Sequence, residues 1–188
     1  MAYRTKTIFV VRNAETAGQG AYDSLTATGF AQASRLAVLL AREKIDRIVS
    51  SPYLRAIQTA EPLAQTPGLR IEMDDRLVER VLCGEPRSDW RELLESSFND
   101  LDARLPGGDS SRDAMNRARD VIRDALDNAA DTTSLITHGC LLTLLLKSLD
   151  ERFGFANWQV LAYPDVFRVT FSDDPLVIQR LDWADALA

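Results

Sequence analysis

The sequence has little of the two residues that most often build metal sites and covalent cross-links. Its 188 residues include one histidine, His138, and two cysteines, Cys83 and Cys140. The cysteines stand far apart and form no paired motif with each other or with the histidine. This pattern predicts neither a disulfide framework nor a structural zinc site.

Clustered positive charge and long apolar runs are also missing. The formal net charge is −6, and lysine and arginine form no basic block. This balance argues against nucleic acid and against an anionic membrane surface as partners. The first residues become polar again too soon for a signal peptide, and the apolar segment Cys140–Leu146 is far shorter than the roughly 20 residues of a membrane span. We expect a soluble cytoplasmic protein.

What the sequence does contain is an ordinary globular composition in which apolar runs alternate with amphipathic segments. Hydrophobic residues make up 46% of the chain and charged residues 27%, and the length suits a single domain, residues 1–188. Runs rich in β-branched residues predict strands, and helical spacing of apolar residues predicts helices. The expected strands are 8–11, 45–49, 69–72, 134–136, 159–162, 167–171 and 176–181, and the expected helices are 30–42, 53–64, 90–101, 110–127 and 140–149.

This order of elements predicts a three-layer α/β/α sandwich with a mostly parallel central sheet and an antiparallel edge strand. The strands that begin at Ile8, Ile45 and Ser134 should be neighbours or nearly so. Residues 74–109 differ in composition from the rest of the chain, because glycine and proline residues flank a weak helical pattern. We interpret them as a cap or insertion that lies over the functional site.

Two of the expected strand ends carry an arginine. The apolar run Ile8–Val11 stops at Arg12, whose planar fork of donors suits a phosphate. Ser51 is a good N-cap for the helix after the second strand, which places Arg55 in its first turn. A cation is disfavoured there, so Arg55 suggests a bound anion. The alternatives are a surface salt bridge for Arg12 and a solvated side chain for Arg55.

A third strand end carries the single histidine. His138 follows the strand 134–136 and precedes Gly139, which lets a ligand approach backbone N–H groups closely. A lone histidine is more often structural. The loops after parallel strands share one edge of the sheet, however, so Arg12, Arg55 and His138 should meet there. Two arginines and an imidazole suit a phosphoryl group and need no metal.

Five motifs in order run through these positions. They read VVRNAET, LTATGFAQA, SSPYLRAIQTA, LVE and LITHG. Together they resemble the histidine phosphatase superfamily, the phosphoglycerate-mutase-like proteins. The resemblance covers the chain from Ile8 to Leu149. It implies phosphoryl chemistry on a small phosphorylated substrate, with no metal or other cofactor.

The resemblance also implies roles for individual residues. Arg12, Arg55 and His138 correspond to the family's phosphate pocket, which would take a phosphorylated small molecule or inorganic phosphate. Glu79 corresponds to the proton donor for the leaving alcohol, with an ordinary surface carboxylate as the alternative. Further substrate contacts are expected for Thr16, Gln19 and Gly139.

The sequence departs from the family pattern at the nucleophile. The family's phosphorylated histidine corresponds to Asn13 in VVRNAET, and a carboxamide has no comparable basic nitrogen. Asn13 can still donate a hydrogen bond to phosphate, so binding can persist while the covalent step is lost. Cys140 is the alternative nucleophile, since a helix N-terminus would lower its pKa, but a buried packing role is favoured.

Three hypotheses remain open from the sequence. The chain is a phosphomonoesterase whose phosphohistidine step is impaired by Asn13, or a catalytically inactive pseudo-phosphatase that binds a phosphorylated ligand. The third is a structural homodimer without anion affinity. A phosphatase is favoured over a mutase because the chain is short. Residues 74–109 should set the substrate, and they offer Arg80, Arg87, Trp90, Arg91 and Phe98 as contacts.

Overall fold

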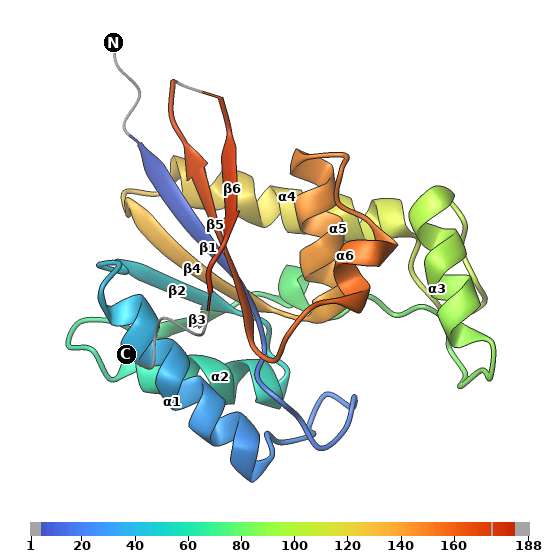
Figure 1. Cartoon of the computed structure of the whole chain (residues 1–188), viewed down its shortest axis with the longest axis horizontal. Coiled ribbons are helices and arrows are strands. Elements are labelled where there is room, and N and C mark those ends of the chain that lie inside the picture. The colour runs from blue at the N-terminus through green and yellow to red at the C-terminus, as the bar shows by residue number, and fades with distance from the viewer. Residues whose placement is uncertain (1–4, 174, 183–188) are drawn as a thin grey trace.

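The computed structural model describes residues 5–173 and 175–182, which form a six-stranded sheet with helices on both faces (Figure 1). The strand order is β3-β2-β4-β1-β5-β6. The strands are β1 Lys6–Arg12, β2 Arg47–Ser50, β3 Ile71–Met73, β4 Thr132–Thr137, β5 Asp165–Phe171 and β6 Val177–Arg180. The three strands that carry the predicted site, β2, β4 and β1, are direct neighbours, as expected.

The sheet is parallel across β3, β2, β4 and β1, whereas β5 pairs antiparallel with β1 and β6 antiparallel with β5. The register aligns Arg12 of β1 with Thr137 of β4, and Ser50 of β2 with Ile136. The carboxyl ends of the three central strands therefore lie level with one another. The mostly parallel sheet with its antiparallel edge is confirmed.

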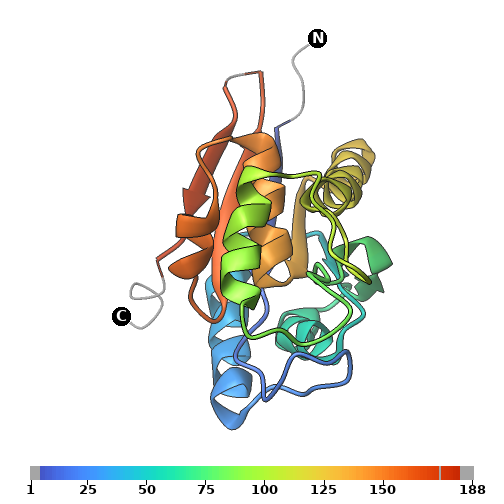
Figure 2. The same ribbon diagram turned by 90° about the vertical axis from the view of Figure 1, so that its right-hand side faces the viewer.

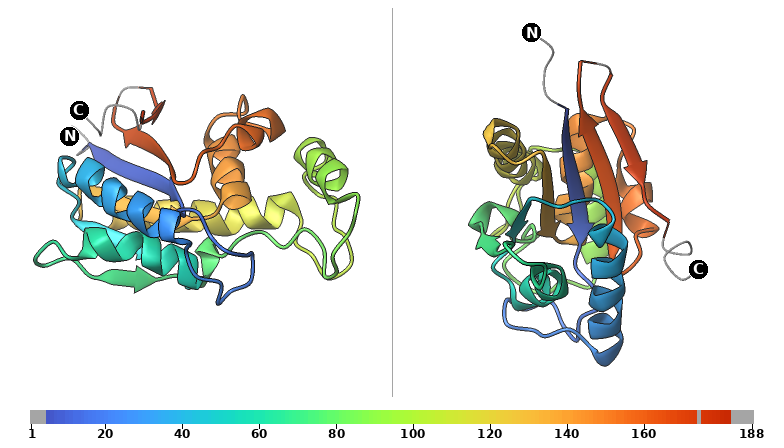
Figure 3. Two further views of the ribbon diagram at one scale, coloured as in Figure 1. Left: turned by 60° about the horizontal axis from the view of Figure 1, so that its bottom comes forward. Right: turned by 90° about the vertical axis from the view of Figure 1, so that its left-hand side faces the viewer.

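Helices cover the two faces separately, as Figures 1 and 3 show. One face carries α1 Ala27–Ala41 and α2 Leu54–Ala64, and the other carries α4 Ser111–Asp127 and α5 Gly139–Leu149. Alternate residues of β1 serve the two cores: Phe9 and Val11 pack with α1 and α2, and Ile8 and Val10 pack with α4 and α5. A strand buried on both sides reads as a continuous apolar run, which is why β1 was evident in the sequence.

Two local predictions were wrong. Residues 159–162 are not a strand: Gln159 ends the short helix α6, Phe155–Gln159, and residues 160–162 follow it. The helix begins where the Asn157 side chain accepts a hydrogen bond from Gly154 N–H at 2.9 Å. Phe155 and Trp158 pack against the core, so burial of aromatic side chains favours the helix. Ser51 is not the N-cap of α2, because Tyr53 holds that position without a side-chain cap. Ser110 caps α4 and forms a capping box with Asp113.

Residues 74–109 contain the 3-10 turn Asp75–Leu77 and the helix α3, Trp90–Asn99. The chain runs out to α3 and back in two adjacent stretches, and Figure 2 shows α3 outermost on that side. The stretches touch closely at Gly84 and Gly107, where a Cβ on Gly107 would lie 2.8 Å from the Gly84 Cα. Gly107 also has a φ of +71°, which side chains disfavour. That this segment acts as a cap remains an interpretation.

Candidate active site

The ends of β1, β2 and β4 bring Asn13, Ser51 and His138 together. The strand ladder continues one residue past the strands, since Asn13 N–H donates to Thr137 O at 2.8 Å and Ser51 N–H donates to Ile136 O at 2.9 Å. His138 follows Thr137 directly and precedes α5. All three side chains are buried. The carboxyl ends of the three central strands therefore meet in one buried polar cluster.

These three side chains form one hydrogen-bonded chain. The Asn13 amide is oriented by its Nδ2, which donates to Ala14 O at 2.7 Å, and this leaves Oδ1 facing His138 Nδ1 at 3.1 Å. On the other side of the ring, His138 Nε2 lies 2.8 Å from Ser51 Oγ. We assign the tautomer from these partners: Nδ1–H donates to Asn13, and Nε2 accepts from the Ser51 hydroxyl.

The environment keeps His138 neutral. Burial lowers the pKa of His138 well below 6.5, and the positive charges of Arg55, Arg117 and Arg12 lower it further. A neutral ring is what the hydrogen-bonded chain requires, because Nε2 must carry a lone pair. The imidazole therefore adds no charge to the site, and the positive potential around it comes from arginine.

Acidification should destabilise the folded protein in a pH window set by His138. The unfolded chain takes up the proton near pH 6.5, while the folded chain resists it, so the unfolded state binds more protons and stability falls as the pH drops below 6.5. The slope should approach about 1.4 kcal/mol per pH unit. Urea unfolding from pH 7.5 to 5.5 measures it, and His138→Gln should flatten the profile. An equally steep profile in that variant would assign the effect elsewhere.

Arg12 is held in a fixed position at the end of β1. Its Nη1 donates to Leu161 O at 3.0 Å and to Ala162 O at 3.1 Å, and its guanidinium carbon lies 3.5 Å from the centre of the Tyr163 ring. Asp165, fully buried, accepts from Ala162 N–H at 2.8 Å and so steadies these carbonyls. Burial lowers the pKa of Arg12, which remains a cation at neutral pH.

One edge of Arg12 has unused donor capacity. Arg12 Nε is buried and makes no hydrogen bond within the described part of the chain. This edge packs on Gly139, where a Cβ would lie 3.1 Å from Nε and 3.4 Å from Nη2. Gly139 thus leaves room for the guanidinium beside His138. A buried donor without a partner is costly, and an anion at this edge would satisfy it.

Arg55, in the first turn of α2, contacts the loop between β1 and α1. It is 1% exposed, and its Nη1 donates to Gly20 O at 2.7 Å and to Gln19 O at 3.2 Å. Burial lowers the pKa of Arg55, and the guanidinium packs 4.9 Å from the Tyr53 ring centre. The Gln19 backbone thus contacts Arg55, whereas its side chain is exposed.

Glu79 closes the site at the start of α5. Its Oε1 accepts from Leu141 N–H at 2.9 Å and its Oε2 accepts from Cys140 N–H at 3.1 Å. The carboxylate therefore occupies the helix N-terminus that we expected to be open to a ligand. Arg117 of α4 holds the chain just before Glu79, because its Nη1 donates to the carbonyls of Arg76 and Val78.

The remaining motif residues support the loop between β1 and α1. The Thr16 hydroxyl, which we expected to contact the substrate, is instead hydrogen-bonded within this loop to Gly18 O and Ser24 O. Thr26 caps α1 and donates to the Glu15 carboxylate at 2.6 Å. Other motif side chains, Gln32 and Gln58, accept from backbone N–H groups of the loop. The motifs thus encode the support of the site as well as its ligands.

Cys140 is unsuited to act as a nucleophile. We expected the helix N-terminus to lower its pKa, but burial raises the pKa of the Cys140 thiol to about 12, and the nearby Glu79 carboxylate adds to the rise. The thiolate would be scarce at neutral pH. The buried packing role favoured from the sequence agrees with this environment.

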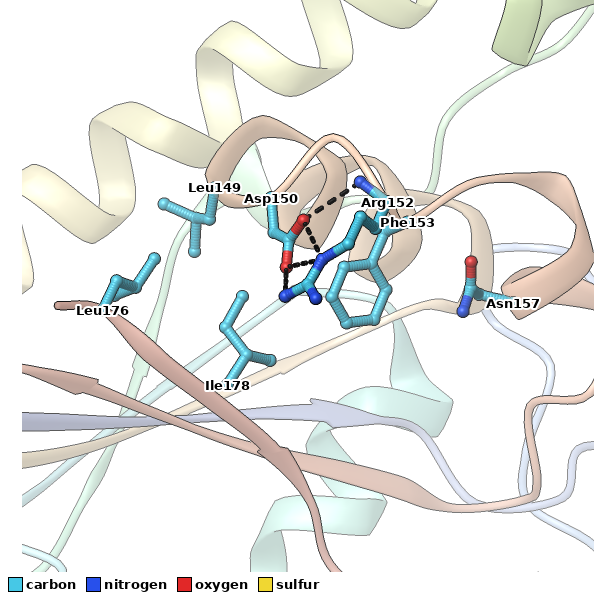
Figure 4. A pocket seen from close by; sticks show the side chains of 7 residues that line it. All are labelled: Leu149, Asp150, Arg152, Phe153, Asn157, Leu176 and Ile178. Atoms are coloured by element: carbon cyan, nitrogen blue, oxygen red, sulfur yellow. Dashed lines mark hydrogen bonds and ion pairs between the residues drawn. The ribbon is translucent and has the colours of Figure 1, made fainter.

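Other parts of the surface offer less chemistry. A pocket of about 440 Å³ lies between the end of α5 and β6, and Arg152 and Asp150 pair there at 2.6 Å. Figure 4 shows this pair beside Leu176 and Ile178. None of the site residues lines it. Within residues 5–173 and 175–182, no group of three His, Cys, Asp or Glu side chains could hold a metal ion. No helix in the same ranges is long and apolar enough to cross a membrane.

Sequence reasoning missed several residues of the site. Ser51 was assigned only to capping, yet it contacts His138. Tyr163 stacks on Arg12 from the far end of the chain, and Tyr53 lies 5.1 Å from the His138 ring. Arg117 is a further, partly buried arginine near His138. The only signal for Ser51 was its place at a strand end beside the other two, and none marked Tyr163.

Comparison with known proteins identifies the family of this chain. The sequence profile described as "Histidine phosphatase superfamily (branch 1)" matches residues 8–183. The chain is 31% identical over 158 residues to "Probable phosphoglycerate mutase GpmB" of Salmonella choleraesuis, covering 78% of this chain and 71% of that protein.

Solved structures show the same fold. A native mycobacterial glucosyl-3-phosphoglycerate phosphatase has a TM-score of 0.74 at 24% identity, covering 89% of this chain and 91% of that one. Its complex with inorganic phosphate has a TM-score of 0.73 at 22% identity, covering 95% and 96%. YhfR of Bacillus stearothermophilus has a TM-score of 0.76 at 22% identity, covering 95% and 98%. The profile match spans nearly the whole described fold, and the chain belongs to the histidine phosphatase superfamily (branch 1).

Proposed function

We propose that the chain binds the phosphoryl group of a small phosphomonoester between Arg12, Arg55 and His138. The observation that carries this proposal is the buried, unpartnered Nε of Arg12, whose edge lies on Gly139 next to His138. Arg55 adds a fully buried cation beside the partly buried Arg12, and the neutral His138 adds no charge. A buried cluster of arginine charge without enough acceptors favours a bound anion.

In this proposal the chain is a phosphomonoesterase whose phosphohistidine step is impaired. Position 13 is where the family has its nucleophile, and the Asn13 amide nitrogen is delocalised and already donates to Ala14 O. The arginines would still stabilise the charge of the phosphoryl group, and Glu79 would supply a proton to the leaving alcohol. Such a site retains binding and loses most of its rate.

A pseudo-phosphatase is the second candidate, and one observation favours it. The side chains of Asn13, His138 and Ser51 satisfy one another in a continuous chain, so Asn13 is accommodated at no cost in buried unpaired groups. A binding protein would hold a phosphorylated ligand without turning it over. Both candidates require anion affinity, which the homodimer hypothesis does not.

Arg12→Lys should weaken the binding of inorganic phosphate by about tenfold or more, because a single ammonium cannot replace two donors of a guanidinium edge. Isothermal titration calorimetry measures the dissociation constant. Arg123→Ala is the matched control, since Arg123 is an exposed arginine of α4 that pairs with Asp120 on the same helix. Absence of phosphate binding by the unaltered chain would refute the proposed function.

A further inference from the structure

A pocket of about 750 Å³ opens beside the candidate active site. Its inner wall contains Tyr53 and Glu79, together with the backbone of Gln19 and Gly20 that accepts from Arg55. The Tyr53 ring lies 5.1 Å from the His138 ring. The pocket therefore adjoins the place where the phosphoryl group would bind, on the side of the expected proton donor.

The outer wall comes from the segment between Glu79 and Trp90. Its side chains include Val81 and Trp90, which are 41% and 43% exposed, and the partly buried Leu82. Trp90 is held in place by edge-on packing against Trp158 of α6 at 6.1 Å between ring centres. A fixed aromatic side chain that remains accessible is well suited to contact a ring or an alkyl chain.

The two arginines that line this pocket, Arg80 and Arg87, are both engaged with other residues of the chain. Arg80 is buried, with its guanidinium donating to Ser97 Oγ at 2.7 Å and to Asp109 O. Arg87 makes a two-bond ion pair with Asp89, with both distances 2.8 Å. The other two charged groups are the carboxylates of Glu79 and Glu85. A second anionic group on a ligand would meet these carboxylates, and both arginines that line the pocket already have partners.

We infer that the substrate is the phosphate ester of an uncharged, aromatic or otherwise apolar alcohol, with the alcohol part in this pocket. This inference rests on the proposed function, since the phosphoryl group must lie at Arg12 and Arg55. A carboxylate on the alcohol part, as in 3-phosphoglycerate or O-phosphoserine, is disfavoured. The specificity of this chain thus differs from what the name of its phosphoglycerate mutase relative indicates for that protein.

The test is a comparison of dissociation constants, measured by calorimetry on the intact chain. 1-Naphthyl phosphate should bind at least about tenfold more tightly than 3-phosphoglycerate or O-phosphoserine, because ring burial is favourable and carboxylates repel. Inorganic phosphate is the reference ligand. If inorganic phosphate fails to bind, the proposed function is wrong. If it binds while the carboxylated esters match or exceed 1-naphthyl phosphate, only the present inference is overturned.

Trp90→Ala should weaken the binding of 1-naphthyl phosphate by about five- to tenfold and leave the affinity for inorganic phosphate unchanged. Tyr22→Ala is the matched control, because Tyr22 is 91% exposed and does not line the pocket. Equal loss for both ligands in Trp90→Ala would overturn the inference, since Trp90 would then act through the structure.

Val81→Arg tests the charge argument in the opposite direction, which a misfolded variant cannot imitate. Val81 is exposed in the wall, and its backbone N–H, which faces Asp109, is unaffected by the change. An added cation should raise the affinity for 3-phosphoglycerate about fivefold or more relative to inorganic phosphate. No relative gain would show that the carboxylate does not reach this wall, and the inference would fail.

Discussion

Asn13→His should raise the rate of aryl phosphate hydrolysis by roughly a thousandfold or more over the unaltered chain. The change introduces a basic ring nitrogen at the end of β1, next to Arg12, which would neutralise phosphoryl oxygens together with Arg55. It also removes the Asn13 Oδ1 acceptor of His138, so the two imidazoles would lie in contact. Release of p-nitrophenol from p-nitrophenyl phosphate measures the gain, and acid-labile phosphate trapped at position 13 would identify the nucleophile.

Asn13→Gln is the control for this experiment, because it changes the size of the side chain without adding a nucleophile. It should remain as slow as the unaltered chain. If Asn13→His also stays inactive, simple phosphomonoesterase activity is excluded and the pseudo-phosphatase remains. If the unaltered chain alone is active, the nucleophile lies elsewhere, and Ser51, hydrogen-bonded to His138, is then a better candidate than the buried Cys140.

Gly29→Ala should destabilise the fold by about 3 kcal/mol, although alanine is intrinsically favoured over glycine in a helix by about 1 kcal/mol. A Cβ on Gly29 would lie 2.0 Å from the carbonyl oxygen of Glu15, a backbone atom that cannot rotate away. Relief requires α1 to move off the loop that carries Gln19 and Gly20. Urea denaturation measures the loss, and phosphate affinity should fall with it, because Arg55 donates to that loop.

Gly154→Ala is the matched control for Gly29→Ala. Gly154 has an extended backbone, and a Cβ there would meet no atom within 4 Å. Its stability should change by less than about 0.5 kcal/mol. If Gly29→Ala is as harmless as this control, the close contact between α1 and Glu15 does not constrain the loop.

The parts of this structure that were predictable from the sequence are those set by periodicity and topology. Arg12 and His138 end parallel strands that are buried on both faces, so their meeting follows from the sheet alone. The hydrogen bond between Ser51 and His138 could not be predicted from the sequence, because it depends on the directions of side chains at the ends of two neighbouring strands. Tyr163 lies in the loop between α6 and β5 and reaches Arg12 through tertiary packing.

The wrong strand at 159–162 has the same kind of cause. A short apolar run of this length does not distinguish a strand from the end of a helix. The packing of Phe155 and Trp158 against the core decided in favour of α6, and that left the carbonyls of Leu161 and Ala162 free to accept from Arg12. Residues 160–162, wrongly predicted as part of a strand, thus hold Arg12 in the site.

The Glu79 carboxylate occupies the N–H donors at the start of α5, where another anion could otherwise bind. The N–H groups of Cys140 and Leu141 each have one hydrogen to donate, and the carboxylate takes both. A phosphoryl group that reached these donors would compete with Glu79 and free its oxygens toward the adjoining pocket. Binding of the phosphoryl group would then displace the Glu79 carboxylate from the N-terminus of α5. The same event would make Glu79 accessible to the substrate.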